Sequence, residues 1–280
     1  MSASQSRPRI AIVNTYFGTP PAWLPAFFRS CQANPDVQWL IYADFEAVPP
    51  TPANVSIRFL DLRGFNDRAS AAVGVPIKID RATLRKVCDF KPIYGLMFAD
   101  DLGDFEWWAY SDLDVVWGDI KKFVTDDLLD SQIIISPRQR KLGGHGTFVR
   151  NTDATNRTFE IVPDVRSILT NPTYLRLDEN ILTNHLRELI AASSFKARPK
   201  IYWEQEMTIT AEYQKALLAG GADWRMWWRN GRAFDAEGRE VMYLHFHKLV
   251  KCMTSIDFGF GETPLAFSLS RDGIRAEPNA

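Results

Sequence analysis

Short apolar runs recur along the first 150 residues, and segments with helical patterning separate most of them. A short run of β-branched or aromatic residues that is bounded by polar residues or glycine is typical of a buried strand. Strands that alternate with helices predict an α/β fold, in which a mostly parallel central sheet carries helices on both faces. The predicted strands span residues 10–13, 39–42, 57–60, 105–110, 132–136 and 146–149.

Helical patterning indicates how the chain returns between strands. Pro92 divides one segment into a predicted pair of helices, and Asp178 is the predicted N-cap of a later one. The predicted helices span residues 23–31, 83–98, 154–169 and 179–190. Other segments are predicted as weakly helical or irregular (64–79), loop-like (200–232), a final strand (239–250) and a polar tail after Arg271.

The composition is that of an ordinary globular protein. Of the 280 residues, 46% are apolar and 24% are charged, and the formal net charge is -1. These values exclude a disordered chain, a collagen-like fibre and a coiled coil. They also argue against a dedicated duplex-DNA binder, which usually carries a basic excess, so we expect no nucleic-acid partner.

Cysteine content and hydropathy indicate the compartment. Cys31, Cys88 and Cys252 cannot form a closed disulfide framework, so a reducing compartment is expected. Residues 1–9 are polar and lack the apolar region of a secretory signal, and no apolar run is long enough to span a bilayer. We therefore expect a cytoplasmic location, with which peripheral association at the inner face of the membrane is compatible.

Two carboxylates follow the aromatic-rich predicted strand 105–110. Asp112 and Asp114 stand one residue apart at the strand's carboxyl end, where open α/β sheets bind ligands. Side chains two positions apart on a strand point the same way, so both can reach one hard cation. Mg²⁺ and Mn²⁺ prefer oxygen ligands and often bridge protein carboxylates to substrate phosphates. The alternative is that one aspartate caps a turn and the other is solvated.

A second polar cluster lies near the end of the chain. His245 and His247 share one face of a predicted strand, and Lys248 and Lys251 follow them. A neutral imidazole can complete the coordination of Mn²⁺, and a lysine can neutralise a phosphate. Together with the two aspartates, this cluster could hold a metal-bound diphosphate. The alternative is a pair of hydrogen-bonded histidines beside solvated lysines.

With these two motifs the sequence resembles the nucleotide-sugar glycosyltransferases of the GT-A fold. In glycosyltransferase family 8, a C-terminal His-Phe-x-Gly-x-x-Lys supplies a metal ligand and a phosphate-binding lysine. His245, Phe246 and Lys251 occupy those spacings, while Lys248 stands where that family has glycine. Residues 86–95 and 105–119 are similar to a poorly characterised bacterial group of such enzymes that is linked to surface-polysaccharide synthesis.

The resemblance implies one GT-A (Rossmann-like) domain over residues 1–280. Residues 8–120 would form a nucleotide-binding half that ends in Asp-x-Asp, and residues 121–260 an acceptor half that carries the late His/Lys motif, before the polar tail at 271–280. No repeat, low-complexity tract or linker divides the chain further.

The resemblance also implies ligands and substrates: Mn²⁺ or Mg²⁺, a nucleotide-sugar donor that is most often a UDP-sugar, and a hydroxyl of a saccharide or glycolipid as acceptor. The implied metal ligands are Asp112, Asp114 and either His245 or His247, because strand register decides which histidine faces the site. The implied donor contacts are Asn14, Thr15, Tyr16 and Phe17 for the nucleobase, Asp44 for base or ribose, Asp89 and Lys91 for the donor, and Asp112 and Lys251 for the phosphates. The lysine cluster itself adds Lys248 as a further candidate for the phosphates. Core packing is the alternative for Tyr16 and Phe17, and a helix cap is the alternative for Asp89.

An inverting transferase needs a carboxylate to deprotonate the acceptor hydroxyl. Asp178 and Glu179, at the start of a predicted helix, are the first candidates, and Glu204 and Glu206 are the second. The helix dipole is an alternative reason for acidic residues at 178 and 179. A retaining enzyme would need no such base.

Two further features are compatible with sugar binding. The glycine-rich residues 143–147 would let the backbone approach a ligand, and His145 could hydrogen-bond a sugar hydroxyl, although a flexible loop with a solvated histidine is the alternative. The chain also has tryptophans that could stack on an acceptor sugar or pack in the core: Trp203, Trp224, Trp227 and Trp228.

Two rival functions remain open at this point. The Asp-x-Asp motif also resembles haloacid-dehalogenase-type phosphatases, in which Asp112 would attack phosphorus and Asp114 would act as acid and base. In those enzymes the motif normally follows the first strand, whereas here about 110 residues precede it. The other rival is an inactive carbohydrate-binding scaffold, which would have no need of Asp112, Asp114, His245 and Lys251 together.

Overall fold

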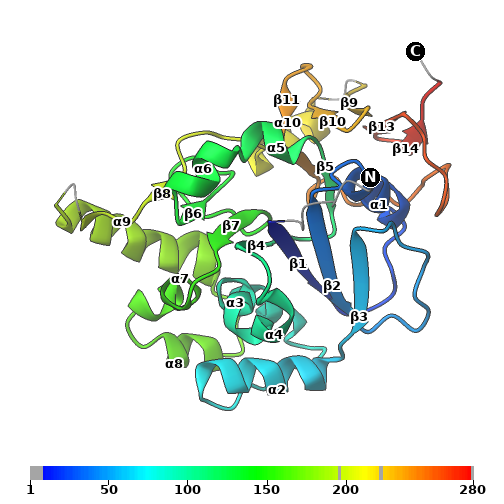
Figure 1. Cartoon of the computed structure of the whole chain (residues 1–280). Helices are drawn as coiled ribbons and strands as arrows, with labels where there is room; N and C mark the ends of the chain where they lie inside the picture. The colour runs from blue at the N-terminus through cyan, green and yellow to red at the C-terminus, as the bar shows by residue number, and fades with distance from the viewer. Residues whose placement is uncertain (1–8, 195–196, 221–222, 279–280) are drawn as a thin grey trace, which may run out of the picture.

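The computed structural model describes residues 9–194, 197–220 and 223–278 (Figure 1). A seven-stranded sheet forms its centre, in the order β3-β2-β1-β4-β7-β6-β8. The first four of these strands are parallel, β7 is antiparallel to both of its neighbours, and β8 is parallel to β6. The strands are β1 (Ile10–Tyr16), β2 (Val37–Ala43), β3 (Val55–Phe59), β4 (Trp107–Tyr110), β6 (Ile134–Ile135), β7 (Thr147–Arg150) and β8 (Ile201–Tyr202). The predicted α/β fold with a mostly parallel sheet is therefore confirmed.

Both faces of the sheet are buried, because successive side chains of a strand point to opposite faces. On β1, Ala11 and Val13 belong to one apolar cluster, whereas Ile10 and Ile12 belong to the other. The first cluster is covered by α2 (Leu62–Val73), η1 (Leu84–Ile93), α3 (Tyr94–Met97), α4 (Ala99–Leu102), η2 (Thr158–Ile161), α8 (Val165–Thr170) and α9 (Thr183–Ala192). The second is covered by α1 (Leu24–Gln32), α5 (Ile120–Phe123) and α6 (Asp126–Ser131), and Figure 1 shows α1 and α2 on opposite sides of β1–β3.

Two smaller sheets were not predicted. An antiparallel sheet runs in the order β11-β10-β9-β13-β14 around a third apolar cluster, and β12 pairs with β5. The strands are β5 (Val115–Trp117), β9 (Arg225–Arg229), β10 (Arg232–Phe234), β11 (Glu240–Val241), β12 (Tyr243–His245), β13 (Ala266–Ser270) and β14 (Gly273–Ala276).

Several predictions for the second half were wrong in detail. Residues 239–250 form two short strands and a turn instead of one strand, and residues 200–232 contain β8, α10 (Ala211–Ala219) and β9 instead of a loop. Residues 273–276 pair with β13 and are not a free tail. Aromatic side chains in β9 and β13 pack across the small sheet, and this packing supplies order that local pattern does not show.

The helices also differ from their predictions. The segment predicted as weakly helical contains the regular helix α2, which begins at Leu62, because the Asp61 carboxylate accepts a hydrogen bond from Gly64 N and Gly74 ends the helix with φ 71°. The segment 154–169 is three short helices: α7 (Asp153–Asn156), η2 and α8. Asp178 is no N-cap, because the π-helical turn η3 (Leu177–Leu182) begins one residue before it.

Candidate functional site

The loop between β4 and β5 presents the Asp-x-Asp motif at the carboxyl end of the parallel strands. Three hydrogen bonds to backbone carbonyls hold this loop: Asn14 Nδ2 donates to Asp112 O at 3.1 Å, Trp23 Nε1 to Leu113 O at 2.9 Å, and Phe246 N to Asp114 O at 3.0 Å. Asn14 is fully buried. Asn14 therefore holds the backbone of the loop, whereas we predicted that it contacts a nucleobase.

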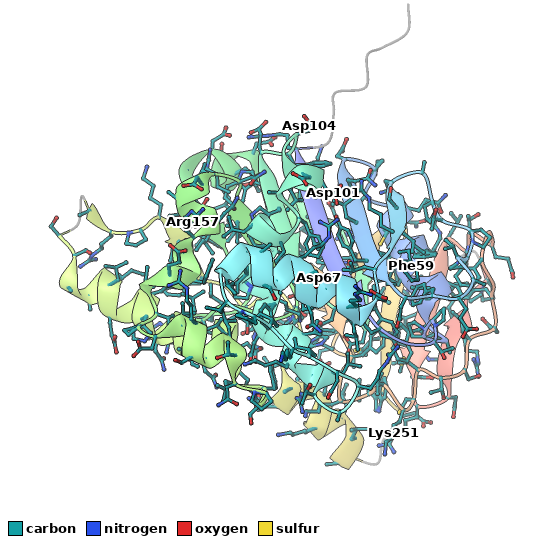
Figure 2. All side chains as sticks on the ribbon, turned by 90° about the horizontal axis from the view of Figure 1, so that it is seen from below. Phe59, Asp67, Asp101, Asp104, Arg157 and Lys251 are labelled. Atoms are coloured by element: carbon teal, nitrogen blue, oxygen red, sulfur yellow. The ribbon has the colours of Figure 1, made fainter. Side chains whose placement is uncertain are left out.

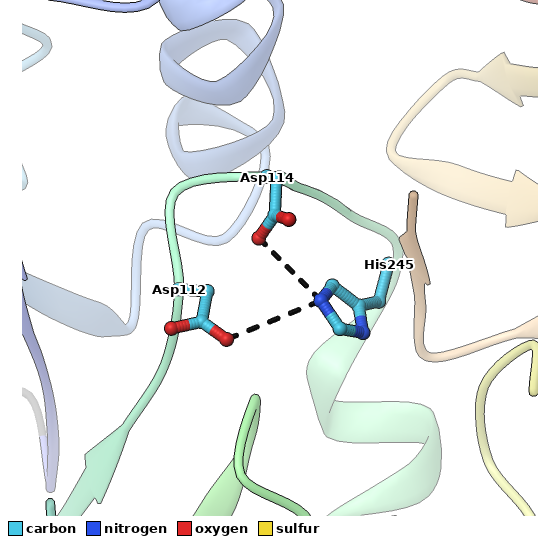
Figure 3. Close-up of side chains that lie close together, drawn as sticks. All are labelled: Asp112, Asp114 and His245. Atoms are coloured by element: carbon cyan, nitrogen blue, oxygen red, sulfur yellow. Dashed lines mark ion pairs between the residues drawn. The ribbon is translucent and has the colours of Figure 1, made fainter. Parts of the chain in front are cut away.

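The pairing of β12 with β5 brings the late histidine motif to the same place. His245 pairs with Val115, the residue that follows Asp114. His245 Nε2 lies 3.4 Å from Asp114 Oδ1 and 4.0 Å from Asp112 Oδ2 (Figure 3). One ligand atom from each of the three residues lies within 4.8 Å of the others.

This geometry fits a divalent cation. Octahedral Mg²⁺ or Mn²⁺ with bonds of about 2.1 Å needs adjacent ligands about 3 Å apart and opposite ligands about 4 Å apart. Two carboxylates and one imidazole form a donor set that suits Mn²⁺, since carboxylate and imidazole are both among its ordinary ligands. A small closure of the three side chains would complete the protein side of such a site.

Lys91 neutralises the first aspartate. Its Nζ lies 2.5 Å from Asp112 Oδ1 and 2.5 Å from the carbonyl oxygen of Gly144. Burial by itself would lower the pKa of Lys91, but the charge of Asp112 raises it well above the ordinary value. Lys91 therefore stays charged and places a fixed cation beside the carboxylate cluster.

Three histidine rings stack next to the aspartates. The centroids of His145 and His245 are 4.0 Å apart, and those of His245 and His247 are 4.6 Å apart. Burial is the first cause that lowers the pKa of His145 well below its usual value and the pKa of His247 to about 4, and the neighbouring His245 adds to both shifts. Tyr243 Oη lies 2.8 Å from His145 Nδ1. Neutral imidazoles are the form that ligates metals.

Asp114 has the opposite shift. Burial alone would raise the pKa of its carboxyl, but the adjacent His245 outweighs that effect and lowers the pKa below its ordinary value. Asp114 is therefore ionised at neutral pH, as a metal ligand must be.

A cavity of about 580 Å³ opens over this cluster. Its wall brings together many of the predicted site residues: Thr15, Tyr16, Lys91, Asp112, Asp114, His145, Asp178, Glu179, His245, His247 and Lys248. These residues come from both predicted halves of the chain.

Asp178 has one carboxyl oxygen that is satisfied and one that is not. It is 1% exposed, Oδ1 accepts a hydrogen bond from Glu179 N at 2.8 Å, and Oδ2 has no hydrogen-bond partner among the described residues. Burial raises its pKa to about 7. The cavity wall thus contains a carboxyl group with one unpaired oxygen, and this group is close to half-protonated at neutral pH.

Other predicted donor contacts lie outside the cavity wall. Phe17 is buried edge-on against Phe65, and Asp44 accepts from Gly18 N at 2.6 Å and pairs with Arg81. Lys251 lies on the surface (Figure 2). Phe17 therefore packs in the core, which was the alternative to the predicted nucleobase contact, and Asp44 braces the turn after β1. Lys251 does not line the cavity, and its predicted phosphate contact stays a prediction.

Asp89 needs the clearest correction. It is fully buried in an ion pair with Lys86, whose Nζ lies 2.8 Å away. Asp89 does not line the cavity. Its role is therefore structural, whereas we predicted that it contacts the donor.

The second-choice acids and the tryptophans also lie elsewhere. Glu204 is exposed, and Glu206 pairs with Arg138 at 2.7 Å. None of the four tryptophans predicted as a stacking platform lines the cavity. Three of them are buried in the core, and the fourth packs against arginines of its own strand: Trp203, Trp224 and Trp228, and then Trp227.

The cavity wall also includes residues that were not predicted from the sequence as site residues. Among them are cations and two aromatic residues: Arg85, Arg138, Lys141, Arg176 and Lys215, with Trp23 and Tyr174. Arg85 and Arg176 stand close in sequence to predicted site residues, and that proximity was the only local signal. The others reach the cavity through tertiary packing alone.

The sequence matches the model of DUF6625, a family of unknown function, over residues 12–258. The chain belongs to this family. No curated protein matches the sequence.

Among solved structures, this DUF6625 member is similar to the galactosyltransferase LgtC in complex with donor and acceptor sugar analogs. The identity is 9%, the match covers 85% of this chain and 87% of that one, and the TM-score is 0.45. It is also similar to the glycosyltransferase GlyE of Streptococcus pneumoniae TIGR4 (12% identity, 86% of this chain and 55% of that one, TM-score 0.40). A third is mouse xyloside xylosyltransferase 1 in its apo form (8% identity, 84% and 96%, TM-score 0.41). Similarity at these values does not show the chemistry, which has to be argued from the residues of the site.

No helix in the described part of the chain is long and apolar enough to cross a membrane.

Proposed function

We propose that this protein is a metal-dependent glycosyltransferase that moves a sugar from a nucleoside-diphosphate donor to a hydroxyl of a saccharide or glycolipid. One observation carries the proposal: Asp112, Asp114 and His245 converge beside Lys91 in a cavity wide enough for a sugar nucleotide. The two motifs lie some 130 positions apart in the sequence, and a simple binding module has no need to bring them together.

The three ligands would hold Mn²⁺ or Mg²⁺. When bound, the cation supplies Lewis-acid stabilisation of the charge that develops on the leaving diphosphate. Lys91 and Lys248 add positive charge at the same end of the cavity, where the leaving group needs it.

The donor would lie across the carboxyl ends of β1 and β4. Thr15 and Tyr16 line the cavity at the end of β1, which is the place for the nucleobase and ribose. A UDP-sugar is the proposed donor, on the resemblance to GT-A glycosyltransferases, and surface-polysaccharide synthesis is the proposed context. The expected setting is the cytoplasm, at the inner face of the membrane if the acceptor is a glycolipid.

Asp178 and Glu179 are the proposed acid–base candidates. A carboxyl group with a pKa near 7 can accept the proton of an acceptor hydroxyl and release it again at neutral pH. Its unpaired Oδ2 leaves one oxygen available for that contact.

A thermal-shift panel of UDP, GDP, CDP and ADP, each with and without Mn²⁺, tests the proposal. A nucleotide that binds only the folded state raises the melting temperature. We expect one nucleotide to do so only with Mn²⁺, and the shift to vanish in Asp114→Asn. The exposed Asp67 on α2 (Figure 2) provides the control, since Asp67→Asn should respond like the wild type.

The same panel separates the rival functions. Phosphatase activity with Mg²⁺, in the absence of any nucleotide shift, would favour the phosphohydrolase. Absence of both responses would favour the inactive scaffold. Full turnover in a variant with alanine at Asp112 and Asp114 would also refute the proposed transferase mechanism.

A further inference from the structure

Two arginines and a tyrosine in the cavity wall come from η1 and from the segment before η3. Arg85, Tyr174 and Arg176 all line the cavity. The guanidinium carbon of Arg85 lies 4.9 Å from the centre of the Tyr174 ring, which is a cation–π contact. Both guanidinium groups are exposed, and neither has an ion-pair partner in the described parts of the chain. They are therefore available to an anion in the cavity.

The backbone of Arg176 is strained at this point. Its φ is 56° and its ψ is 57°, a left-handed conformation that costs free energy for a residue with a Cβ. Four non-glycine residues in the described ranges have positive φ, and Arg176 is the one among them that lines the cavity. Strain of this kind persists only where the surrounding structure enforces it.

The enforcing structure is the buried pair Lys86–Asp89. Asp89 Oδ2 accepts from Leu175 N at 2.8 Å, and Asp89 Oδ1 accepts from Leu177 N at 2.9 Å. These two amides flank Arg176 on either side. Lys86 Nζ lies 2.8 Å from the same carboxylate and also donates to the carbonyls of Ile168 and Thr173. Lys86 and Asp89 are 1% and 0% exposed, so this clamp is rigid and dry.

The clamp has a consequence for the cavity. Because Lys86 directly follows Arg85, the same short segment of η1 carries one arginine of the wall and holds the loop that carries the other. The backbone segments that carry Arg85 and Arg176 are thus held by one buried ion pair. Asp178 and Glu179 lie in the π-helical turn that starts at Leu177, directly after Arg176.

The proposed transferase site balances its charges without these two arginines. A divalent cation on Asp112 and Asp114 would balance both carboxylates, and Lys91 and Lys248 stand beside the place proposed for the diphosphate. Arg85, six residues before Lys91 on η1, and Arg176, which directly precedes η3, add two further positive charges to the cavity wall. A planar guanidinium is well suited to two-point hydrogen bonding with a carboxylate or phosphate group.

We propose that Arg85 and Arg176, held by Tyr174 and by the Lys86–Asp89 clamp, form a subsite for the acidic group of a sugar substrate. This inference rests on the proposed function and adds the substrate class: one of the two sugars that meet in the cavity carries a carboxylate or a phosphate. The acidic group belongs either to the donor sugar or to the acceptor, and the experiment below separates the two sources.

Calorimetric titrations of the full chain with Mn²⁺ provide the test. The donor arm compares UDP-glucuronic acid with UDP-glucose. The acceptor arm, with UDP present, compares a hyaluronan tetrasaccharide with chitotetraose, and glucose 6-phosphate with glucose. We expect the acidic member to bind at least about tenfold more tightly in one arm, because a charge-assisted hydrogen bond to a charged group contributes on that scale.

Two variants assign any preference to the subsite. Arg85→Gln removes one guanidinium, and Arg176→Gly removes the other while relieving the backbone strain, so folding is preserved. We expect each to reduce the acidic preference severalfold and the double variant to abolish it, with the affinity for UDP and Mn²⁺ unchanged. The exposed arginine of α2 provides the matched control, since Arg63→Gln should leave the preference intact.

Three outcomes would overturn the inference. Equal binding of acidic and neutral probes in every arm, while UDP still binds with Mn²⁺, would refute the subsite and leave the proposed function standing. Loss of UDP affinity in the arginine variants would assign these residues to the diphosphate instead. Failure of the wild type to bind UDP with Mn²⁺ would refute the UDP-dependent function on which the inference rests.

Discussion

The Gln214 side chain donates a 2.7 Å hydrogen bond from Nε2 to the backbone carbonyl of His245, the imidazole ligand of the proposed metal site. Its Oε1 accepts from Lys248 N at 2.9 Å, so one fully buried amide holds both ends of the segment 245–248. Gln214 belongs to α10, a helix in a region that we predicted as loop-like. The metal ligand is therefore positioned by an element far from both motifs.

Replacing Gln214 should weaken metal binding without unfolding the protein. In Gln214→Ala the carbonyl of His245 and the amide of Lys248 lose their partner, and His245 loses its fixed position. Loss of a residue that orients a ligand typically lowers metal affinity about 10- to 100-fold. Titration with Mn²⁺, followed by electron paramagnetic resonance, measures this change. Gln38→Ala on β2 is the control, and equal Mn²⁺ affinity in both variants would contradict the positioning role.

The Lys86–Asp89 clamp should dominate the stability of the η1–η3 region. Asp89→Ala leaves a buried ammonium without its partner, and breaking a buried pair in this way costs about 3–5 kcal/mol. The free energy of unfolding from urea titration measures the loss. The double variant Lys86→Met/Asp89→Leu removes both charges and should regain only the part of the loss that comes from the unpaired ammonium, because the amides of Leu175 and Leu177 still lack their acceptor.

The exposed pair Asp153–Arg157 gives the comparison for the clamp. Its two side chains are 82% and 46% exposed, and Asp153→Ala should cost less than about 1 kcal/mol. A cost for Asp89→Ala as small as that of Asp153→Ala would show that the buried pair is not a clamp.

The raised pKa of Asp178 predicts a pH-dependent stability for the metal-free protein. The folded pKa of about 7 lies above the ordinary value of 3.8, so the folded state binds the proton more tightly. The stabilisation that Asp178 gives the folded state is fully present below the pKa of the unfolded state, and it is lost as the pH rises through the pKa of the folded state. The free energy of unfolding should fall by up to about 1.4 kcal/mol per pH unit in that window.

Asp178→Asn isolates this effect because asparagine does not titrate. Its stability relative to the wild type should increase between about pH 4 and pH 7 and remain constant above that range. Urea titrations at several pH values measure the difference. Asp67→Asn should show no such pH dependence, and a flat difference for Asp178→Asn would contradict the raised pKa.

Gly146 should not tolerate a side chain. A Cβ at this position would lie 2.7 Å from Tyr243 Oη, which is bonded to His145. The buried tyrosine ring would have to move, and such overpacking costs about 1–3 kcal/mol. Thermal unfolding of Gly146→Ala measures the cost. Gly103→Ala is the control, because its Cβ would meet only Ala99 O at 3.6 Å, and an equal loss in both variants would contradict the steric explanation.

Sequence pattern was sufficient to predict the layers of the first half and the chemistry of the motif residues. Alternation of short apolar runs with helical segments predicted the parallel strands β1–β4, because burial on both faces demands apolar residues throughout. Asp112, Asp114 and His245 were identified as ligand types, since hard cations select carboxylate oxygens and a neutral imidazole is a common metal ligand.

Which of these candidate residues lie close together depends on tertiary packing. The register of β12 against β5 directs His245 Nε2 toward Asp114, and it places Lys248, not Lys251, in the cavity wall. Asp89 was predicted as a donor contact but is buried, whereas Arg176 was not predicted and lines the cavity. A buried carboxylate that accepts from two backbone amides cannot be distinguished in sequence from one that binds a ligand. Such roles depend on contacts between residues that are distant in the chain, and local sequence pattern does not indicate those contacts.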